Sequence, residues 1–156
     1  MRFWSGFTGK TDFGLMWNAD YYFVQFPGVA TEFEFDFHEF GGGLAYDFRH
    51  FVLWGGAYYS PDYFLGSGDA TWIGLEAGRA VPHPFSEIVP AYFSAHWGNQ
   101  FVDQDQPTAF QDYQHWGAAF TLDAVGFKWR FEATDTNVKH LDGADERLFL
   151  TVTKSF

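Results

Sequence analysis

The 156-residue sequence contains no cysteine and no long apolar segment. Without cysteine there is no disulfide scaffold and no thiolate metal site. A membrane-spanning helix needs roughly 18 to 20 consecutive apolar residues. The longest such run in this chain, 51–59, has only the length of a strand. The absences therefore exclude a disulfide-stabilised miniprotein and a bundle of membrane-spanning helices.

Basic residues are also scarce, because nine Lys and Arg stand against 20 Asp and Glu, for a formal net charge of −11. Nucleic-acid binding depends on a basic surface, so we expect no nucleic-acid partner. The acidic surplus favours solvated loops and, in a pore, a preference for cations. Residues 1–4 lack the apolar core and cleavage site of an export signal. An exported protein needs that signal, so we expect the sequence to be processed, engineered or incomplete.

Aromatic residues and glycine are abundant in this chain. The sequence has 21 Phe, 8 Tyr and 7 Trp, which make up 23% of its residues, and it has 17 Gly. Aromatic residues favour strands, and glycine allows tight turns and close approach between strands. So many rings in a short chain indicate a second apolar surface besides a core. The lipid-facing wall and interfacial girdles of a membrane β-barrel supply such a surface.

Apolar and polar residues alternate with a period of two in several segments, which indicates strands. Along 127–132 aromatic residues alternate with charged ones, and Ala133 and Thr134 continue the alternation of apolar and polar residues. Along 147–153 apolar residues alternate mostly with polar ones. A helix would spread these rings and charges around its whole circumference. We expect one face, directed toward lipid, to carry Phe127, Trp129, Phe131, Leu148, Leu150 and Val152, and the other to carry Lys128, Arg130, Thr151 and Thr153.

This alternation predicts nine strands, near 2–9, 12–26, 31–47, 50–60, 70–81, 87–98, 110–123, 125–135 and 146–156. Gly41–Gly43 is expected to mark a bulge or bend, and Pro90 to disturb the ladder of the sixth strand. The sequence therefore predicts a single all-β domain over 1–156. We expect an antiparallel transmembrane β-barrel of about 8–10 strands in an up-and-down meander.

The last predicted strand runs to the final residue, Phe156, although chain termini usually fray. An aromatic strand at the C-terminus resembles the assembly signal of bacterial outer-membrane proteins. The connections mostly alternate between short and long, as in barrels with short periplasmic turns and longer external loops. By that alternation the strand at 2–9 starts outside, so either it is not a strand or upstream strands are missing. We expect the last strand to pair with an N-terminal segment or with another copy in a homo-oligomer.

The segment Tyr58–Phe64 (Tyr-Tyr-Ser-Pro-Asp-Tyr-Phe), followed by Gly66–Asp69 and Trp72–Gly78, resembles the TorF-type porin family. This family consists of conserved hypothetical outer-membrane proteins of proteobacteria. The resemblance covers the family's C-terminal two thirds and lacks its N-terminal strands. Its most specific block is the motif Tyr59, Ser60, Pro61 and Asp62. The resemblance implies a channel in the outer membrane of Gram-negative bacteria, without a defined substrate.

Two columns of charged residues are candidates for the wall of a barrel lumen. These candidates, together with one histidine, are Glu32, Glu34, Asp36, His38, Lys128, Arg130, Glu132 and His115. One interpretation is a cation-selective wall on the acidic strand and a transverse field from the mixed strand. The alternatives are an ordinary solvated sheet face for the acidic column and, for the mixed column, charges that pair and fill the interior of a small barrel.

Signals for catalysis are missing, since no Gly-Xaa-Ser-Xaa-Gly elbow and no phosphate-binding glycine loop is found. The six histidines are scattered without the spacing of metal ligands. We therefore expect no enzyme, no cofactor and no metal site. The predicted function is an outer-membrane porin or narrow passive channel, with membrane lipid and small solutes or ions as partners. The alternative is a water-soluble β-barrel or sandwich that binds a small ligand.

Overall fold

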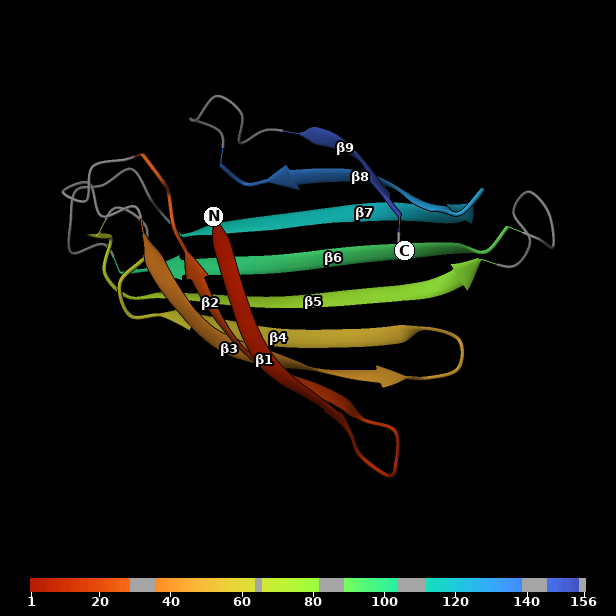
Figure 1. The fold of residues 1–156 in the computed structure, drawn as a ribbon, viewed down its shortest axis with the longest axis horizontal. Helices are drawn as coiled ribbons and strands as arrows, with labels where there is room; N and C mark the ends of the chain where they lie inside the picture. The colour runs from red at the N-terminus through yellow and green to blue at the C-terminus, as the bar shows by residue number, and fades with distance from the viewer. Residues whose placement is uncertain (29–35, 64–65, 82–88, 104–111, 139–145, 155–156) are drawn as a thin grey trace. The chain divides into compact units, whose positions relative to one another are not determined.

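A computed structural model describes residues 1–28, 36–63, 66–81, 89–103, 112–138 and 146–154. In sequence order the strands are β1 (Arg2–Lys10), β2 (Met16–Val24), β3 (Phe37–Asp47), β4 (Val52–Ser60), β5 (Ala70–Val81), β6 (Ala91–Val102), β7 (Tyr113–Ala124), β8 (Phe127–Thr136) and β9 (Arg147–Thr153). They form one antiparallel sheet in which each strand pairs with its neighbours in the chain (Figure 1). The predicted all-β, up-and-down meander is confirmed. The described residues contain no helix with the length and apolar character to cross a membrane.

Several predicted strand boundaries differ from the observed ones, including the starts of the second and sixth strands. The second strand starts at Met16 because residues 11–15 form a turn, in which the Gly14 N–H donates to the Thr11 carbonyl at 3.0 Å. The sixth strand starts at Ala91, immediately after Pro90, and continues to Val102. Proline has no N–H to give to a ladder. The strand begins after Pro90, which therefore does not lie inside it as predicted. Closure of the sheet through β1 and β9 stays a prediction, and Phe156 lies outside the described residues.

Of the bulge or bend predicted at Gly41–Gly43, the bulge is absent from the pairing of β3 with β2. Asp20 pairs with Gly41 and Asn18 with Gly43, so the register passes through the glycines without an extra residue. The glycines leave room for rings on the next strand. A Cβ on Gly43 would lie only 2.6 Å from Nε1 of Trp54. Gly43 thus leaves room for the Trp54 indole and Gly41 for the Tyr58 ring, whereas a Cβ on Gly42 would meet the backbone of Asn18.

A two-residue turn, Val125–Gly126, joins β7 to β8. Both residues have positive φ, at 58° and 75°. This conformation belongs to the type I′ turns that match the twist of a β-hairpin. Valine is a poor residue for it, because a β-branched side chain is crowded at positive φ.

The chain divides into two compact units. Unit 1 comprises Met1–Tyr46, Trp54–Gly74 and Asn99–Tyr113, and unit 2 comprises Asp47–Leu53, Leu75–Gly98 and Gln114–Phe156. Buried apolar side chains are few among the described residues, namely Phe37, Ala70, Ala91, Val102 and Ala119. Only Phe37 among them is large, so the described part of neither unit has a conventional core of large apolar side chains.

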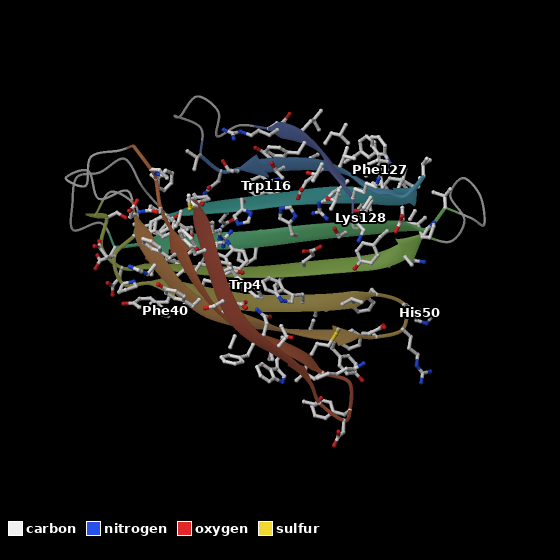
Figure 2. All side chains as sticks on the ribbon, viewed as in Figure 1. Trp4, Phe40, His50, Trp116, Phe127 and Lys128 are labelled. Carbon is white, nitrogen blue, oxygen red and sulfur yellow. The ribbon has the colours of Figure 1, made fainter. Side chains whose placement is uncertain are left out.

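In unit 1 the register of β1, β2 and β3 gives the sheet two different faces. The first, called here the cavity face, carries Arg2, Trp4, Asn18, Asp20, Tyr22 and Glu39. The opposite face, called here apolar face 1, carries Phe3, Phe7, Trp17, Tyr21, Phe23, Phe40 and Leu44. Trp4 and Phe40, which represent the two faces, are labelled in Figure 2.

In unit 2 the register of β8 and β9 confirms the predicted division into two faces. Arg130 pairs with Thr151 and Lys128 with Thr153 on a charged face, while Phe131 pairs with Leu150 on the other. The neighbours Phe127 and Lys128, which leave opposite faces, are labelled in Figure 2. This second face, called here apolar face 2, carries Phe127, Trp129, Phe131, Leu148, Leu150 and Val152.

Candidate functional site

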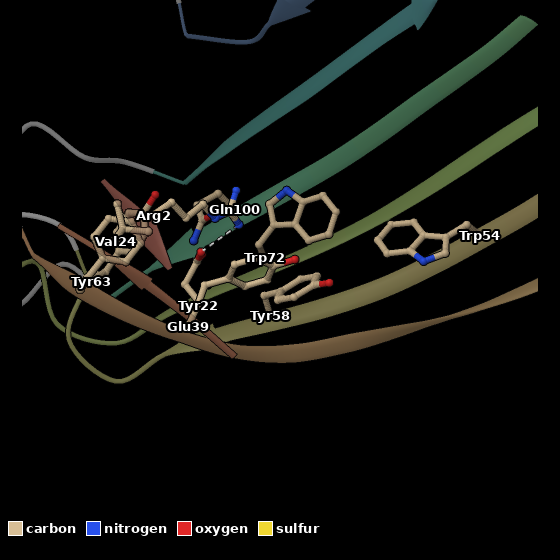
Figure 3. A pocket seen from close by; sticks show the side chains of 10 residues that line it. Arg2, Tyr22, Val24, Glu39, Trp54, Tyr58, Tyr63, Trp72 and Gln100 are labelled. Atoms are coloured by element: carbon tan, nitrogen blue, oxygen red, sulfur yellow. Dashed lines mark ion pairs between the residues drawn. The ribbon is translucent and has the colours of Figure 1, made fainter. Parts of the chain in front are cut away.

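Unit 1 contains a cavity of about 480 Å³ on its cavity face. Figure 3 shows its side chains, which come from β1 to β6 and from the segment after β4. They are Arg2, Tyr22, Val24, Phe37, Glu39, Trp54, Tyr58, Tyr63, Trp72 and Gln100. A cavity of this size lies in the range of small-molecule sites, which are mostly aromatic and apolar with a few polar groups.

Four rings form a continuous wall of this cavity. The centroids of Trp54 and Trp72 lie 6.0 Å apart, those of Tyr58 and Trp72 5.8 Å, and those of Tyr22 and Tyr58 5.7 Å. Because alternate residues of a strand share a face, Trp54 and Tyr58 project from β4 to the same side. The ring faces carry partial negative charge, which attracts cations.

An ion pair occupies the same cavity. The Arg2 guanidinium lies 3.7 Å from the Glu39 carboxylate, and its central carbon lies 3.9 Å above the centre of the Tyr22 ring. The Arg2 side chain is 59% exposed, whereas that of Glu39 is only 20% exposed. Ion pairs with one well-exposed partner contribute little, about 0–1 kcal/mol. Glu39 is therefore a shielded carboxylate whose cationic partner is held loosely.

A second carboxylate, Asp20, fixes the position of the Tyr58 ring. The Tyr58 hydroxyl donates to Oδ2 of Asp20 at 2.9 Å, and the Trp4 indole N–H donates to Oδ1 at 3.2 Å. The Asn18 amide also donates to Asp20. Hydrogen bonds to a charged group are worth about 1.5–3 kcal/mol each. This network holds one side of the aromatic wall in place.

Tyr63 lies after β4 and lines the cavity next to Phe37, with ring centroids 4.8 Å apart. Its backbone N–H donates to the Gly68 carbonyl at 2.9 Å, which anchors the turn that carries it. Burial raises the pKa of its phenol to about 12. The side chain thus remains neutral over the physiological pH range.

The charged face of unit 2 carries four of the predicted lumen residues, Lys128, Arg130, Glu132 and His115. Arg130 donates from Nε and Nη2 to the two carboxylate oxygens of Glu132, both at 3.1 Å. Nδ1 of His96 lies 3.7 Å from the same carboxylate, and the rings of His96 and His115 are 5.8 Å apart. Lys128 lies on the same face of β8, two residues before Arg130. The Arg130–Glu132 pairing agrees with the alternative in which charges of the mixed column neutralise one another.

The structure describes two residues of the acidic column expected on the third strand, Asp36 and His38. Asp36 precedes β3, and its Oδ1 accepts from the Phe26 N–H at 2.8 Å. His38 lies on apolar face 1, stacked on Phe23 with centroids 4.7 Å apart. Glu32 and Glu34 lie outside the described residues. The alternation in the sequence predicted that His38 lies on the polar face of the strand. The pairing with β2 instead places Glu39 on the cavity face and His38 on the opposite one.

The motif taken from the family resemblance forms the end of β4 and the turn after it. The Tyr59 hydroxyl donates to Asp69 at 2.8 Å, and Ser60 Oγ donates to the Asp62 carbonyl at 3.2 Å. Ser60 is buried, and Pro61 follows the last strand residue. In this structure the motif forms the turn that precedes Tyr63, whose side chain lines the cavity.

No protein-family model, curated protein or solved structure matches this chain. Within the described part of the chain, no cluster of three or more His, Asp or Glu is arranged to hold a metal ion. The site is therefore defined by its own geometry, an aromatic wall with shielded carboxylates.

Sequence patterns did not single out Glu39, and they pointed to Tyr58 and Trp72 only as parts of the family resemblance, without a role in a cavity. One signal was available, namely glycines at alternate positions of β3, which indicate rings packed across the strand. Gly41 lies against Tyr58 and Gly43 against Trp54. The partner strand of each glycine depends on register, so that signal alone does not identify the ring.

Proposed function

We propose that this chain forms a narrow β-barrel of a bacterial outer membrane that passes or holds small solutes or ions. The observation that carries the proposal is the uncovered apolar surface on the faces opposite the cavity and the charged cluster. Leu148 and Leu150 are 87% and 58% exposed, and Phe7 is 76% exposed. Contiguous apolar surface of this kind marks contact with a partner or a membrane.

The nine-strand meander supports the same proposal. All backbone groups of a membrane-spanning sheet must be paired, since each unpaired group in lipid costs several kcal/mol. In this proposal the outer edges of β1 and β9 pair with each other or with another copy of the chain. The resemblance of the Tyr59–Asp62 block to TorF-type porins points in the same direction.

A matched pair of substitutions on β9 tests the membrane assignment. Leu150→Lys introduces a charge on apolar face 2, whereas Phe149→Lys introduces the same charge opposite Glu132 on the charged face. A lysine directed toward the middle of a bilayer costs about 2–4 kcal/mol. We expect Leu150→Lys to block folding into lipid vesicles and Phe149→Lys to leave it nearly unchanged. Equal tolerance of both variants would refute the membrane assignment.

A planar-bilayer recording tests the pore itself. A net charge of −11 leads us to expect cation preference in the reversal potential under a salt gradient. This preference should weaken as salt rises, because the screening length falls from about 10 Å at 0.1 M to about 3 Å at 1 M. Anion preference would contradict the acidic-lumen idea. Absence of conductance would contradict an open pore.

The second candidate function is a water-soluble β-barrel or sandwich that binds a small ligand, and the cavity of unit 1 favours it. The two candidates differ in what apolar face 2 contacts. In water, Leu150→Lys should be neutral because Leu150 is already well exposed. A protein that stays folded and soluble without detergent, with Leu150→Lys harmless, would establish this second function over the first.

A further inference from the structure

We propose that the cavity of unit 1 binds a solute with a guanidinium or similar planar cationic group, which enters by displacing the side chain of Arg2. This inference deepens the proposed function, on which it rests, by naming the class of solute. The chain's own arginine shows what the site accepts. Its guanidinium already lies on the Tyr22 ring and beside the Glu39 carboxylate (Figure 3).

The chemistry of the wall selects for a cation. Six aromatic rings line the cavity, four of them in the continuous wall. Ring faces attract ammonium and guanidinium groups within about 6 Å of their centres. Glu39 supplies a shielded carboxylate at the wall. Asp20, which accepts a hydrogen bond from the Tyr58 hydroxyl, adds a second negative charge next to this wall. Arg2 is the one cationic side chain among the residues that line the described cavity.

The exposure of Arg2 makes it a replaceable occupant. More than half of its side chain contacts solvent, and its 3.7 Å distance to Glu39 is longer than a hydrogen bond. A free solute with the same head group makes the same contacts and can also cover the Trp54 and Trp72 rings. Arg2 then competes with the solute for the site. The apparent affinity for the solute is the intrinsic affinity multiplied by the fraction of molecules in which Arg2 has left the site.

Calorimetric titration of the full chain in non-ionic detergent micelles tests this proposal, with methylguanidinium as the probe. Methylurea serves as the matched probe because it has a similar planar shape without charge. We expect saturable binding of methylguanidinium and at least about tenfold weaker binding of methylurea, which corresponds to about 1.4 kcal/mol. Equal binding of the two would overturn the proposal.

Three variants locate the site and the competition. Glu39→Gln should weaken methylguanidinium binding about tenfold or more, because it removes the shielded carboxylate. Asp123→Asn, the control, removes one carboxylate of unit 2 and should leave binding unchanged. Arg2→Ala should strengthen binding several-fold, since the competitor is gone. Weaker binding by Arg2→Ala, or equal effects of Glu39→Gln and Asp123→Asn, would overturn the proposal.

Failure of this inference is distinguishable from failure of the proposed function. If the protein conducts cations in a bilayer but does not bind methylguanidinium, the inference is overturned and the pore stands. If methylguanidinium binds with the expected variant pattern but no conductance is seen, the inference is supported and the open pore is refuted.

Discussion

Gly43→Ala tests whether the aromatic wall depends on glycines in the facing strand. A Cβ at Gly43 would lie 2.6, 2.7 and 2.8 Å from Nε1, Cε2 and Cζ2 of Trp54. Carbon atoms in ordinary contact are about 3.5–4.0 Å apart, so the indole must withdraw by about 1 Å. Its neighbours restrict that movement, because the same ring covers Gly56 and lies 6.0 Å from the Trp72 ring. Overpacking of this kind costs about 1–3 kcal/mol.

A double-mutant cycle with Trp54→Ala isolates this contact. Removal of the indole takes away the three atoms nearest to the Cβ at Gly43. Alanine in a strand is more favourable than glycine by about 0.5–1 kcal/mol. We therefore expect Gly43→Ala to destabilise the parent and to be neutral or stabilising in the Trp54→Ala background. The measurement is urea unfolding in lipid vesicles or detergent, followed by circular dichroism. A cost that is the same in both backgrounds would refute the role assigned to the glycine.

Three further predictions concern single sites. Val125→Asn should stabilise the protein by about 1 kcal/mol in urea unfolding, because asparagine before Gly126 suits the positive φ of the turn; any loss of stability would argue against a type I′ turn. In the parent, the pKa of Tyr63 is about 12 in the folded state and lower in the unfolded chain, so the free energy of unfolding falls between pH 10 and about 12. Tyr63→Phe should remove this fall and flatten the profile of stability against pH. A profile identical to the parent's would contradict burial of the phenol. Glu132→Gln should cost about 1–3 kcal/mol, and less once Arg130 is also replaced by Gln, because the pair is bidentate; additive losses would show that the two groups are not coupled.

The sequence by itself determined the strands and most of their faces. Side chains of a strand alternate between its two faces whatever the sequence. Alternation at 127–132 therefore separated rings from charges, and in 147–153 it separated apolar from polar residues except at Phe149, which lies opposite Glu132. The register of β8 and β9 agrees with that division, pairing Arg130 with Thr151 and Phe131 with Leu150. Composition was also informative, since abundant aromatic residues and glycine correctly indicated an all-β chain.

The tertiary structure alone decided which residues meet. The face of β3 follows from its pairing with β2, which sets Tyr22 opposite Glu39 and Phe23 opposite His38. A shift of one residue would exchange the two faces, and local alternation contains no information about the partner strand. The role of Gly41–Gly43 also depends on the partner strand. From the sequence these glycines indicated a bulge or bend, and only the structure shows that rings of β4 pack against Gly41 and Gly43. The cavity combines residues from 2 to 100 in the sequence, which only the packing of successive hairpins brings together.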